Sequence, residues 1–394
     1  MNDPVVIVGA ARTPMGGFQG DLAAMSSPEL GAKAIEAALS RAGIASDRVD
    51  EVLMGCVLSA GLGQAPARQA ALAAGLPTAV PCTTLNKMCG SGMQAAIFAH
   101  DMLRAGSADV LVAGGMESMS NAPYLLEKAR AGYRMGHGKV LDHMFLDGLE
   151  DAYDRGRLMG TFAEDCAERF NFTREQQDAY AIASLERATR AIADGDFADE
   201  IVPVEITTRK GTVRIDSDEQ PPKANRDKIT ALKPAFRTDG TVTAANASSI
   251  SDGAAALVMT RRSVADQLGL KTLAIVHGHA AHARTPGDFT TAPIGAIQRL
   301  FEKTGWSRED VDLYEINEAF AVVAMAAMHE LDIDHAALNV NGGACALGHP
   351  IGASGARILV TLIHALRRRN LNRGVAAICI GGGEATAMAV EVVR

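Results

Sequence analysis

Apolar and polar positions along roughly the first 120 residues follow the strand and helix periods in turn. The pattern predicts strands over 5–9, 49–55, 83–87 and 109–113, and helices over 27–42, 66–74 and about 89–105. Ser26 and Glu29 form a capping box before the first helix, and Gly43 ends that helix. Helices between buried strands predict a parallel sheet that is covered on both faces.

The last 120 residues or so repeat this order. Strands are predicted over 273–278, 313–316, 338–340 and 376–380, and helices over 293–304, 318–329 and 352–369. Val-Ala-Gly-Gly at 112–115 resembles Ile-Gly-Gly-Gly at 380–383. Residues 252–259 resemble the closing strand that 384–390 supplies in the second half. The sequence therefore predicts an α/β protein built from a duplicated βαβαβαββ unit.

An insertion interrupts the first copy of this unit. We expect an N-terminal domain at 1–116 and 251–271, an inserted loop domain at 117–250, and a C-terminal domain at 272–394. The insertion is rich in charge and has one clear helix, from a Thr173–Gln176 capping box to about Asp194. Its basic residues either form a solvated surface or hold an anionic ligand: Arg209, Lys210, Lys223, Arg226, Lys228, Lys233 and Arg237.

Composition narrows the class of protein. The chain of 394 residues is 48% apolar and 21% charged, which is typical of a globular protein and excludes a disordered or collagen-like chain. Its net charge of −8 argues against a nucleic-acid partner but leaves anionic small molecules open. The longest apolar run, 319–328, is too short to span a bilayer, and no signal peptide fits the N-terminus. We expect a cytoplasmic protein with no membrane partner.

Cysteine usage gives the first chemical candidate. The chain has six cysteines without a CxxC pair or metal-ligand spacing, which favours free thiols in a reducing compartment and predicts no metal site. Cys89 lies between a predicted strand and a helix start, next to Gly90. A helix N-terminus lowers a thiol pKa, so Cys89 is a candidate nucleophile for acyl transfer. A buried structural cysteine is the equally weighted alternative.

Three further polar or reactive side chains follow strands. Asn317 comes after the strand at 313–316, His349 precedes the helix at 352–369, and Cys379 ends the strand at 376–380. Ligands bind at the carboxyl ends of strands in open parallel sheets, so these groups form one candidate site with Cys89. A dinucleotide site is discounted, because no GxGxxG motif opens a helix after the first strand.

At these residues the sequence resembles the thiolase family, over essentially the whole chain. The matching motifs are Asn-Lys-Met-Cys-Gly-Ser-Gly at 86–92, Asn-Glu-Ala-Phe at 317–320, Gly-His-Pro at 348–350 and Cys-Ile-Gly-Gly-Gly at 379–383. The resemblance implies a five-layered αβαβα fold with an inserted loop domain. It also implies a homotetramer, a dimer of dimers, that acts on acetyl-CoA in fatty acid metabolism.

The resemblance implies a role for each candidate. Cys89 takes an acyl group from acyl-CoA while His349 accepts the thiol proton, and Cys379 removes an α-proton from the second acyl-CoA. One oxyanion hole is His349 with a water held by Asn317, and the other is the N–H groups of Cys89 and Gly381. The implied reaction is reversible condensation of two acyl-CoA molecules, or thiolysis of a 3-ketoacyl-CoA. CoA is then a substrate or product, and no metal or redox cofactor is needed.

The resemblance also implies substrate-binding residues: Leu158, Met159, Lys228, Phe236, Ala244, Ser248, Phe289, Ala319 and Phe320. Several positions depart from the short-chain pattern. Leu158 stands where a His is usual, Phe289 where a Met is usual, and Glu384 follows the triple glycine. A more apolar pocket wall slightly favours acyl chains beyond four carbons, with acetoacetyl-CoA still accepted.

The adenine-region Arg of the family aligns with Pro221, and Lys223, Arg226 and Lys228 are the candidates to replace it. Two other functions remain open for a chain of this kind. One is a decarboxylating condensing enzyme on the same fold, against which the second cysteine, Cys379, argues. The other is a non-catalytic acyl-CoA or lipid-binding protein, which would have lost a catalytic residue.

Overall fold

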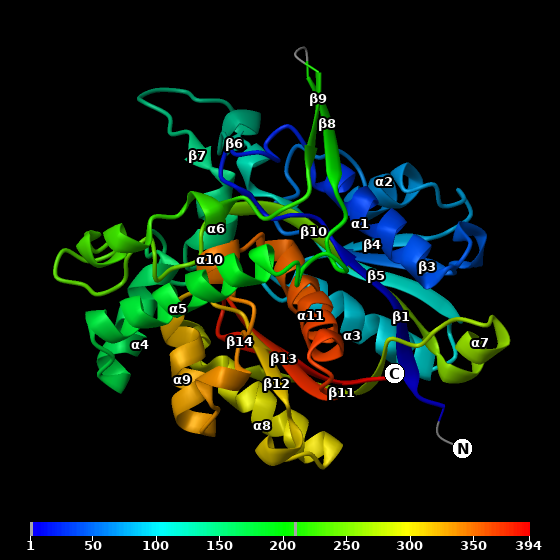
Figure 1. The fold of residues 1–394 in the computed structure, drawn as a ribbon. Coiled ribbons are helices and arrows are strands. Elements are labelled where there is room, and N and C mark those ends of the chain that lie inside the picture. The colour runs from blue at the N-terminus through cyan, green and yellow to red at the C-terminus, as the bar shows by residue number, and fades with distance from the viewer. Residues whose placement is uncertain (1–2, 209–210) are drawn as a thin grey trace.

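The computed structural model describes residues 3–208 and 211–394. Figure 1 shows a large central sheet with helices on its faces and between its two halves. Arg209 and Lys210, two members of the predicted basic cluster, lie outside the described residues. No described helix is long and apolar enough to cross a bilayer.

The first repeat follows the predicted order closely. Its elements are β1 (Val5–Arg12), β2 (Gly16–Gly17), α1 (Ser27–Ala42), β3 (Glu51–Gly55), α2 (Pro66–Ala73), β4 (Cys82–Leu85), α3 (Ser91–Arg104), β5 (Val110–Ser118), β10 (Ser251–Arg261) and α7 (Arg262–Gln267). The predicted capping box of Ser26 with Glu29 is present at α1, and Gly43 ends that helix in the left-handed conformation at φ 68°.

The second repeat has the same succession of elements. They are β11 (Ala274–Ala283), α8 (Ala292–Thr304), β12 (Leu313–Ile316), α9 (Ala321–Leu331), α10 (Ala344–Leu347), α11 (Ile351–Arg368), β13 (Arg373–Ile380) and β14 (Glu384–Val392). Helix α9 begins three residues later than predicted, because 317–320 continue as extended loop after β12. That loop carries the predicted Asn317.

The sheet is mixed, which corrects the prediction of a parallel sheet. Its strand order is β12-β13-β14-β11-β1-β10-β5-β3-β4, and β2 pairs with β10. Strand β3 is parallel to β4 and β5, and β12 is parallel to β13, whereas β1, β10, β11 and β14 pair antiparallel with their neighbours. The closing strands of each repeat turn back beside the parallel core, so only the helix-connected strands run parallel.

Five layers result from this arrangement. Helices α1 and α2 cover the outer face of the N-terminal half-sheet, and α8 and α9 cover the outer face of the C-terminal half-sheet (Figure 1). Helices α3 and α11 pack against each other between the two half-sheets. The fold is therefore the five-layered αβαβα arrangement of two duplicated halves. Because α3 and α11 begin next to Cys89 and His349, the central layer carries the predicted site.

One predicted strand is absent. Residues 338–340 make only an isolated parallel bridge, between Leu338 and Tyr314 of β12. They occupy the place in the second half that β4 occupies in the first. Arg187 and Arg190 donate to the carbonyls of Leu338 and Val340, at 2.7 and 2.8 Å. These bonds lie on the edge away from β12. On the side of β12, the Ile316 N–H donates to the side-chain Oδ1 of Asn339 at 2.9 Å instead of to a backbone carbonyl, and Asn339 has a left-handed φ of 47°, so the ladder stops there.

The residues between β5 and β10 form mostly short elements with two longer helices. They are β6 (Tyr124–Leu125), β7 (Leu141–Asp142), a π-helical turn (Phe145–Leu149), α4 (Met159–Phe170), α5 (Arg174–Ala193), β8 (Val204–Thr208), β9 (Gly211–Ile215) and α6 (Gln220–Lys223). The predicted Thr173–Gln176 capping box begins α5. In β1, the buried Arg12 binds Glu200 and Asp218 of this segment, at 2.5 and 2.7 Å.

Candidate active site

A cavity of about 380 Å³ lies at the ends of α3, α11 and β13. Of the five predicted catalytic residues, Cys89, His349, Cys379 and Gly381 line it. Asn317 does not line it but contacts His349 from behind. The structure therefore brings together side chains from four separate motifs and both halves of the duplicated fold.

Cys89 is held by a tight turn between β4 and α3. The turn passes through Met88, which has the left-handed φ of 48° that non-glycine residues rarely adopt. Asn86 Oδ1 accepts from the N–H of Met88 at 2.9 Å, and Ser91 Oγ accepts from the N–H of Lys87 at 2.8 Å. These bonds keep the turn in place and point a partly exposed Cys89 into the cavity.

The electrostatics of Cys89 correct the sequence expectation. Burial raises its pKa to about 11, although hydrogen bonds from the N–H groups of Gly381 and Cys89 itself favour the thiolate. The sequence predicted a lowered pKa from the helix N-terminus. Cys89 precedes the first residue of α3 by two positions, and loss of water outweighs the two N–H groups.

His349 has a defined tautomer. Its Nδ1 lies 2.6 Å from Ser354 Oγ, and that hydroxyl donates its only proton to the carbonyl of Pro350 at 3.0 Å. With that hydroxyl donating to Pro350, Nδ1 carries the ring hydrogen, and Nε2 has a lone pair that faces Asn317 Nδ2 at 3.5 Å. Burial, followed by the charge of Arg357, lowers the His349 pKa to about 3. At neutral pH His349 is thus an uncharged base. Sequence reasoning missed Ser354, a small residue on α11 without a distinctive motif.

Cys379 is the penultimate residue of β13 and is 1% exposed. Burial raises its pKa well above the ordinary thiol value, and the nearby Cys89 raises it further. A thiol with so high a pKa is a strong base once it has lost its proton. Gly381 follows two residues later, and its N–H faces the Cys89 sulfur.

Asn317 is fully buried behind His349. Its backbone N–H donates to the Ala377 carbonyl at 3.0 Å, and its Nδ2 lies 3.5 Å from His349 Nε2. Asn317 Oδ1 has no hydrogen-bond partner among the described residues. This unpaired acceptor suits a bound water, because a buried polar atom without a partner is costly.

The neighbouring Glu318 fixes the loop that carries Asn317. Its carboxylate accepts from Tyr180 Oη at 2.9 Å, Ser184 Oγ at 2.8 Å, Asn339 Nδ2 at 2.8 Å and the Cys345 N–H at 3.0 Å. Tyr180 and Ser184 come from α5 in the insertion. Sequence reasoning missed this role of Glu318, because its partners are distant in the chain.

The predicted substrate-binding residues divide between two cavities. The following line the cavity that holds the thiols: Leu158, Met159, Phe236, Ala244, Ser248, Phe289, Ala319 and Phe320. Phe320 contacts Phe236 and Phe289, with ring centroids 6.0 and 6.5 Å apart. The wall is therefore largely apolar, with Leu158 and Phe289 in it. Sequence reasoning missed other lining residues. Phe145, Leu149 and Ile250 lie outside the motifs, and Ile351 directly follows the Gly-His-Pro motif but was not singled out.

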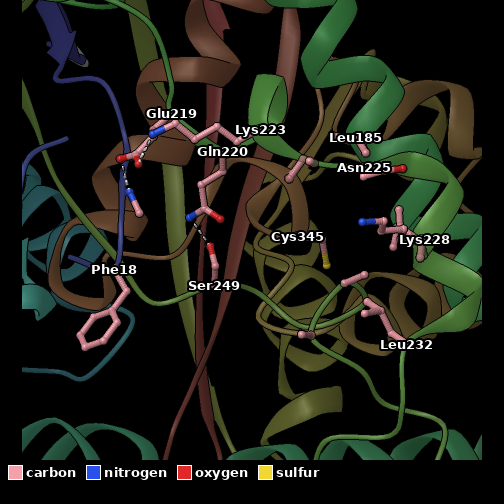
Figure 2. Close-up of a pocket in the computed structure, with 17 residues that line it drawn as sticks. Phe18, Leu185, Glu219, Gln220, Lys223, Asn225, Lys228, Leu232, Ser249 and Cys345 are labelled. Atoms are coloured by element: carbon pink, nitrogen blue, oxygen red, sulfur yellow. Dashed lines mark hydrogen bonds and ion pairs between the residues drawn. The ribbon is translucent and has the colours of Figure 1, made fainter. Parts of the chain in front are cut away.

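Lys228 lines a second cavity, of about 510 Å³, which shares Ala244 and Ser249 with the first. Figure 2 shows Lys228 on the side of this cavity that faces Cys345, while Lys223 lies by Glu219. Lys223 Nζ already pairs with Glu219 at 2.6 Å. Lys228 has no ion-pair partner among the described residues.

The remaining predicted basic residues are mostly neutralised. Arg226 pairs with Glu186 at 2.7 Å, and Arg237 pairs with Glu168 at 2.6 Å and with Asp165. These contacts favour a solvated, internally paired surface for this part of the cluster. Lys228 is the basic residue of the predicted set that lines a cavity and is not paired within the described chain.

Comparisons with known proteins identify the family of the chain. A family described as "Thiolase, N-terminal domain" matches residues 5–263, and "Thiolase, C-terminal domain" matches 270–392. An acetyl-CoA acetyltransferase of Pseudomonas aeruginosa is 50% identical over 98% of each chain, and acetyl-CoA acetyltransferase 2 of Arabidopsis thaliana is 53% identical over 98% of this chain and 97% of its own.

A solved structure extends the likeness to the fold. The Acat5 thiolase of Ascaris suum, crystallised in complex with coenzyme A, superposes with a TM-score of 0.94 at 42% identity. The match covers 99% of this chain and all of the other. Sequence motifs, fold and relatives agree over almost the whole length, and the chain belongs to the thiolase family.

Proposed function

We propose that this protein is an acetyl-CoA C-acetyltransferase that condenses two acyl-CoA molecules and, in reverse, cleaves a 3-ketoacyl-CoA with free CoA. The main support is that two thiols and one uncharged imidazole line a single apolar cavity. They belong to Cys89, Cys379 and His349. The names of the relatives agree with it. This chemistry needs no metal or redox cofactor.

Acylation uses the neutral states of Cys89 and His349. The Cys89 sulfur attacks the thioester carbonyl as His349 Nε2 takes the thiol proton. The bond to the CoA sulfur then breaks, and the imidazolium returns the proton to that sulfur. Acetyl-Cys89 and free CoA result, and His349 is neutral again.

Condensation uses Cys379 as the base. His349 Nε2 takes the Cys379 proton, and the thiolate removes an α-proton from the second acetyl-CoA. The carbanion attacks the acetyl-Cys89 carbonyl, and the Cys89 sulfur leaves and is reprotonated by His349. A base of high pKa suits this step, because α-protons of thioesters are weakly acidic.

Two oxyanions form along this path. The N–H groups of Cys89 and Gly381 both face the Cys89 sulfur, so they suit the oxyanion that forms on the acyl carbonyl there. The enolate oxygen of the second substrate would accept hydrogen bonds from protonated His349 and from a water molecule. That water would donate its other hydrogen to Asn317 Oδ1. One such donor contributes about 3 kcal/mol to lowering a barrier.

Acetylation of Cys89 is the direct test. We expect acetyl-CoA to leave one acetyl group on the Cys89 peptide, measured by peptide mass analysis. Cys379→Ser should still be acetylated there but should not exchange α-protons of acetyl-CoA with deuterated water. Cys166→Ser, a buried thiol outside the cavity, is the control and should do both. Acetyl found on Cys379 alone, or exchange without acetylation, would contradict the assignment.

The two adjoining cavities suit the two ends of CoA. The pantetheine arm fits the apolar cavity, whose thiols must meet the thioester. The phosphates fit the second cavity, where Lys228 offers an unpaired positive charge. Lys223 and Arg226 are less suitable, because carboxylates already neutralise them.

Lys228→Met tests this placement of CoA. We expect KM for CoA in thiolysis to rise about fivefold with kcat nearly unchanged, because one screened charge contact is worth about 1 kcal/mol. Lys233→Met removes a nearby exposed charge that does not line the cavity and serves as the control. An equal effect of both substitutions, or none at Lys228, would refute the role.

The thiolase resemblance supports three broader proposals. The protein assembles as a homotetramer, a dimer of dimers, resides in the cytoplasm and acts in fatty acid metabolism. Sedimentation of the purified protein would check the assembly.

A further inference from the structure

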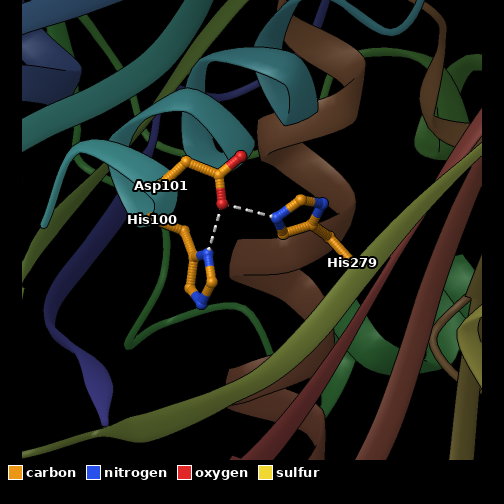
Figure 3. A group of neighbouring side chains, drawn as sticks. All are labelled: His100, Asp101 and His279. Carbon is orange, nitrogen blue, oxygen red and sulfur yellow. Dashed lines mark hydrogen bonds and ion pairs between the residues drawn. The ribbon is translucent and has the colours of Figure 1, made fainter. Parts of the chain in front are cut away.

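A cluster of ligand-type side chains lies away from the two cavities. His100 and Asp101 belong to α3 and His279 belongs to β11, and Figure 3 shows the two rings on either side of the carboxylate. Asp101 Oδ1 lies 2.9 Å from His100 Nδ1 and 2.9 Å from His279 Nε2. The imidazole side chains are only 14% and 18% exposed, whereas the Asp101 side chain is 56% exposed.

We propose that His100, Asp101 and His279 bind a divalent transition-metal ion of the zinc type. Imidazole nitrogen and carboxylate oxygen are donors that Zn²⁺ prefers. The three ligand atoms lie within 4.8 Å of one another. Ligands about 2.0–2.1 Å from a tetrahedral zinc lie about 3.3 Å apart, so small side-chain rotations suffice to place the ion between them.

The geometry of the cluster suits a cation. Asp101 Oδ1 lies 2.9 Å from a nitrogen of each imidazole ring, so the three donor atoms already converge on one point. The ion would take the place of the ring hydrogens on His100 Nδ1 and His279 Nε2, which move to the other ring nitrogens.

The open side of the cluster gives an entry path. Asp101 faces solvent, and water can complete the coordination there. Three protein ligands with an open position are typical of accessible rather than closed zinc sites. None of the three residues lines the cavity with the thiols, so the ion would not contact the reacting groups.

The cluster lies between the two halves of the fold, so a bound ion would affect the stability of the protein. Helix α3 belongs to the N-terminal half and starts just after Cys89, while β11 is the first strand of the C-terminal half. An ion held by both would link the two halves of the fold. Metal that binds only the folded state raises stability with its concentration.

The test must distinguish this site from the thiols of the catalytic cavity. We therefore use Co²⁺ as the probe and enzyme whose accessible cysteines have been alkylated with iodoacetamide. Imidazole and carboxylate ligands give weak visible ligand-field bands, whereas thiolate ligands give intense charge-transfer absorption. The spectrum thus identifies the donor set independently of activity.

We expect about one equivalent of Co²⁺ per chain, weak ligand-field bands only, and a higher Tm in its presence. His100→Gln and His279→Gln should each weaken binding at least tenfold. His329→Gln is the matched control, since His329 is exposed beside the single carboxylate of Glu330 and should leave binding unchanged. The metal-free Tm of each variant checks its folding.

Three results would overturn the proposal. They are no stoichiometric Co²⁺ on the alkylated wild type, a spectrum dominated by thiolate charge transfer, or equal binding by both cluster variants and the wild type. The first two results are measured on the wild type alone. They therefore test the proposal even if a variant folds poorly.

Discussion

At the scale of single residues, Cys89 and His349 line the same cavity as a neutral thiol and a neutral imidazole. Burial disfavours both charged forms, which raises the pKa of Cys89 to about 11 and lowers that of His349 to about 3. The proton therefore has to move during the attack on substrate, since no preformed thiolate–imidazolium pair exists at neutral pH.

The rate of Cys89 alkylation should report this state. In the free enzyme we expect the iodoacetamide rate at Cys89 to rise about tenfold per pH unit from pH 7 to 10, because the reactive thiolate stays a minor species below a pKa of about 11. A free thiol peptide, with an ordinary pKa near 8.5, should level off earlier and is the control. A plateau at Cys89 below pH 8 would show a preformed ion pair instead.

The sequence identified most of these residues but not their electrostatics. Cys89, His349, Cys379 and Asn317 lie at strand ends or helix starts, and local patterns reveal such positions. The pKa of Cys89 depends on how much water the folded chain excludes, which no local pattern encodes. Ser354 was missed for a similar reason. Its role depends on its contact with the His349 ring, which appears only in the folded chain.

At the scale of elements, an ion pair joins the turn that carries Cys89 to the start of β14, the strand that follows the Cys379 strand. Lys87, in the turn between β4 and α3, binds Glu384, which begins β14 just after the glycines that follow Cys379. Their side chains are 27% and 39% exposed. A glutamate at position 384 departs from the usual family pattern. The ion pair of Lys87 with Glu384 is therefore an additional contact of this chain, and it connects the Cys89 turn with the start of β14.

Lys87→Met should lower kcat about fivefold without raising KM for CoA, because a partly exposed pair contributes about 1 kcal/mol and acts here on positioning. Glu384→Gln should have a similar effect, and the double variant should be no worse than either single one. Lys33→Met, which breaks an exposed pair with Glu36 on α1, is the control. Additive losses, or a change confined to KM, would argue against a positioning role.

Most element boundaries could be predicted where local chemistry sets them. The capping boxes at Ser26 and Thr173 predicted helix starts that the structure confirms. The strand predicted at 338–340 was wrong, because the Asn339 side chain takes the Ile316 N–H that a backbone ladder would use, and Asn339 has a left-handed φ. The sequence predicted a parallel sheet instead of the mixed one, since the direction of the closing strands depends on how they pair across the two repeats.

At the scale of the whole molecule, the buried Arg12 anchors the insertion to the sheet. Its guanidinium reaches Glu200 at 2.5 Å and both oxygens of Asp218 at 2.7 and 2.9 Å. These side chains have essentially no exposure to solvent. The insertion supplies Leu158, Met159 and Phe236 to the cavity, so its attachment also shapes the cavity wall.

Arg12→Met should lower the free energy of unfolding by about 3–5 kcal/mol, because two buried carboxylates lose their counter-charge. Urea denaturation at pH 7 measures this loss. Arg214→Met, which breaks an exposed pair with Asp216, should cost less than about 1 kcal/mol. A similar small loss at Arg12 would mean that the carboxylates find other partners.

The two ends of the large sheet differ in a way that bears on self-association. At one end, arginines of α5 occupy the carbonyls of Leu338 and Val340 beside β12. At the other end, β4 is the last strand, with β3 as its only neighbour in the sheet order. Among the described strands of the large sheet, β4 is therefore the one that offers an open edge for backbone pairing between copies. Two copies that paired through β4 would cover the open edge of both large sheets, so growth of these sheets would stop at a closed pair instead of continuing into a fibre.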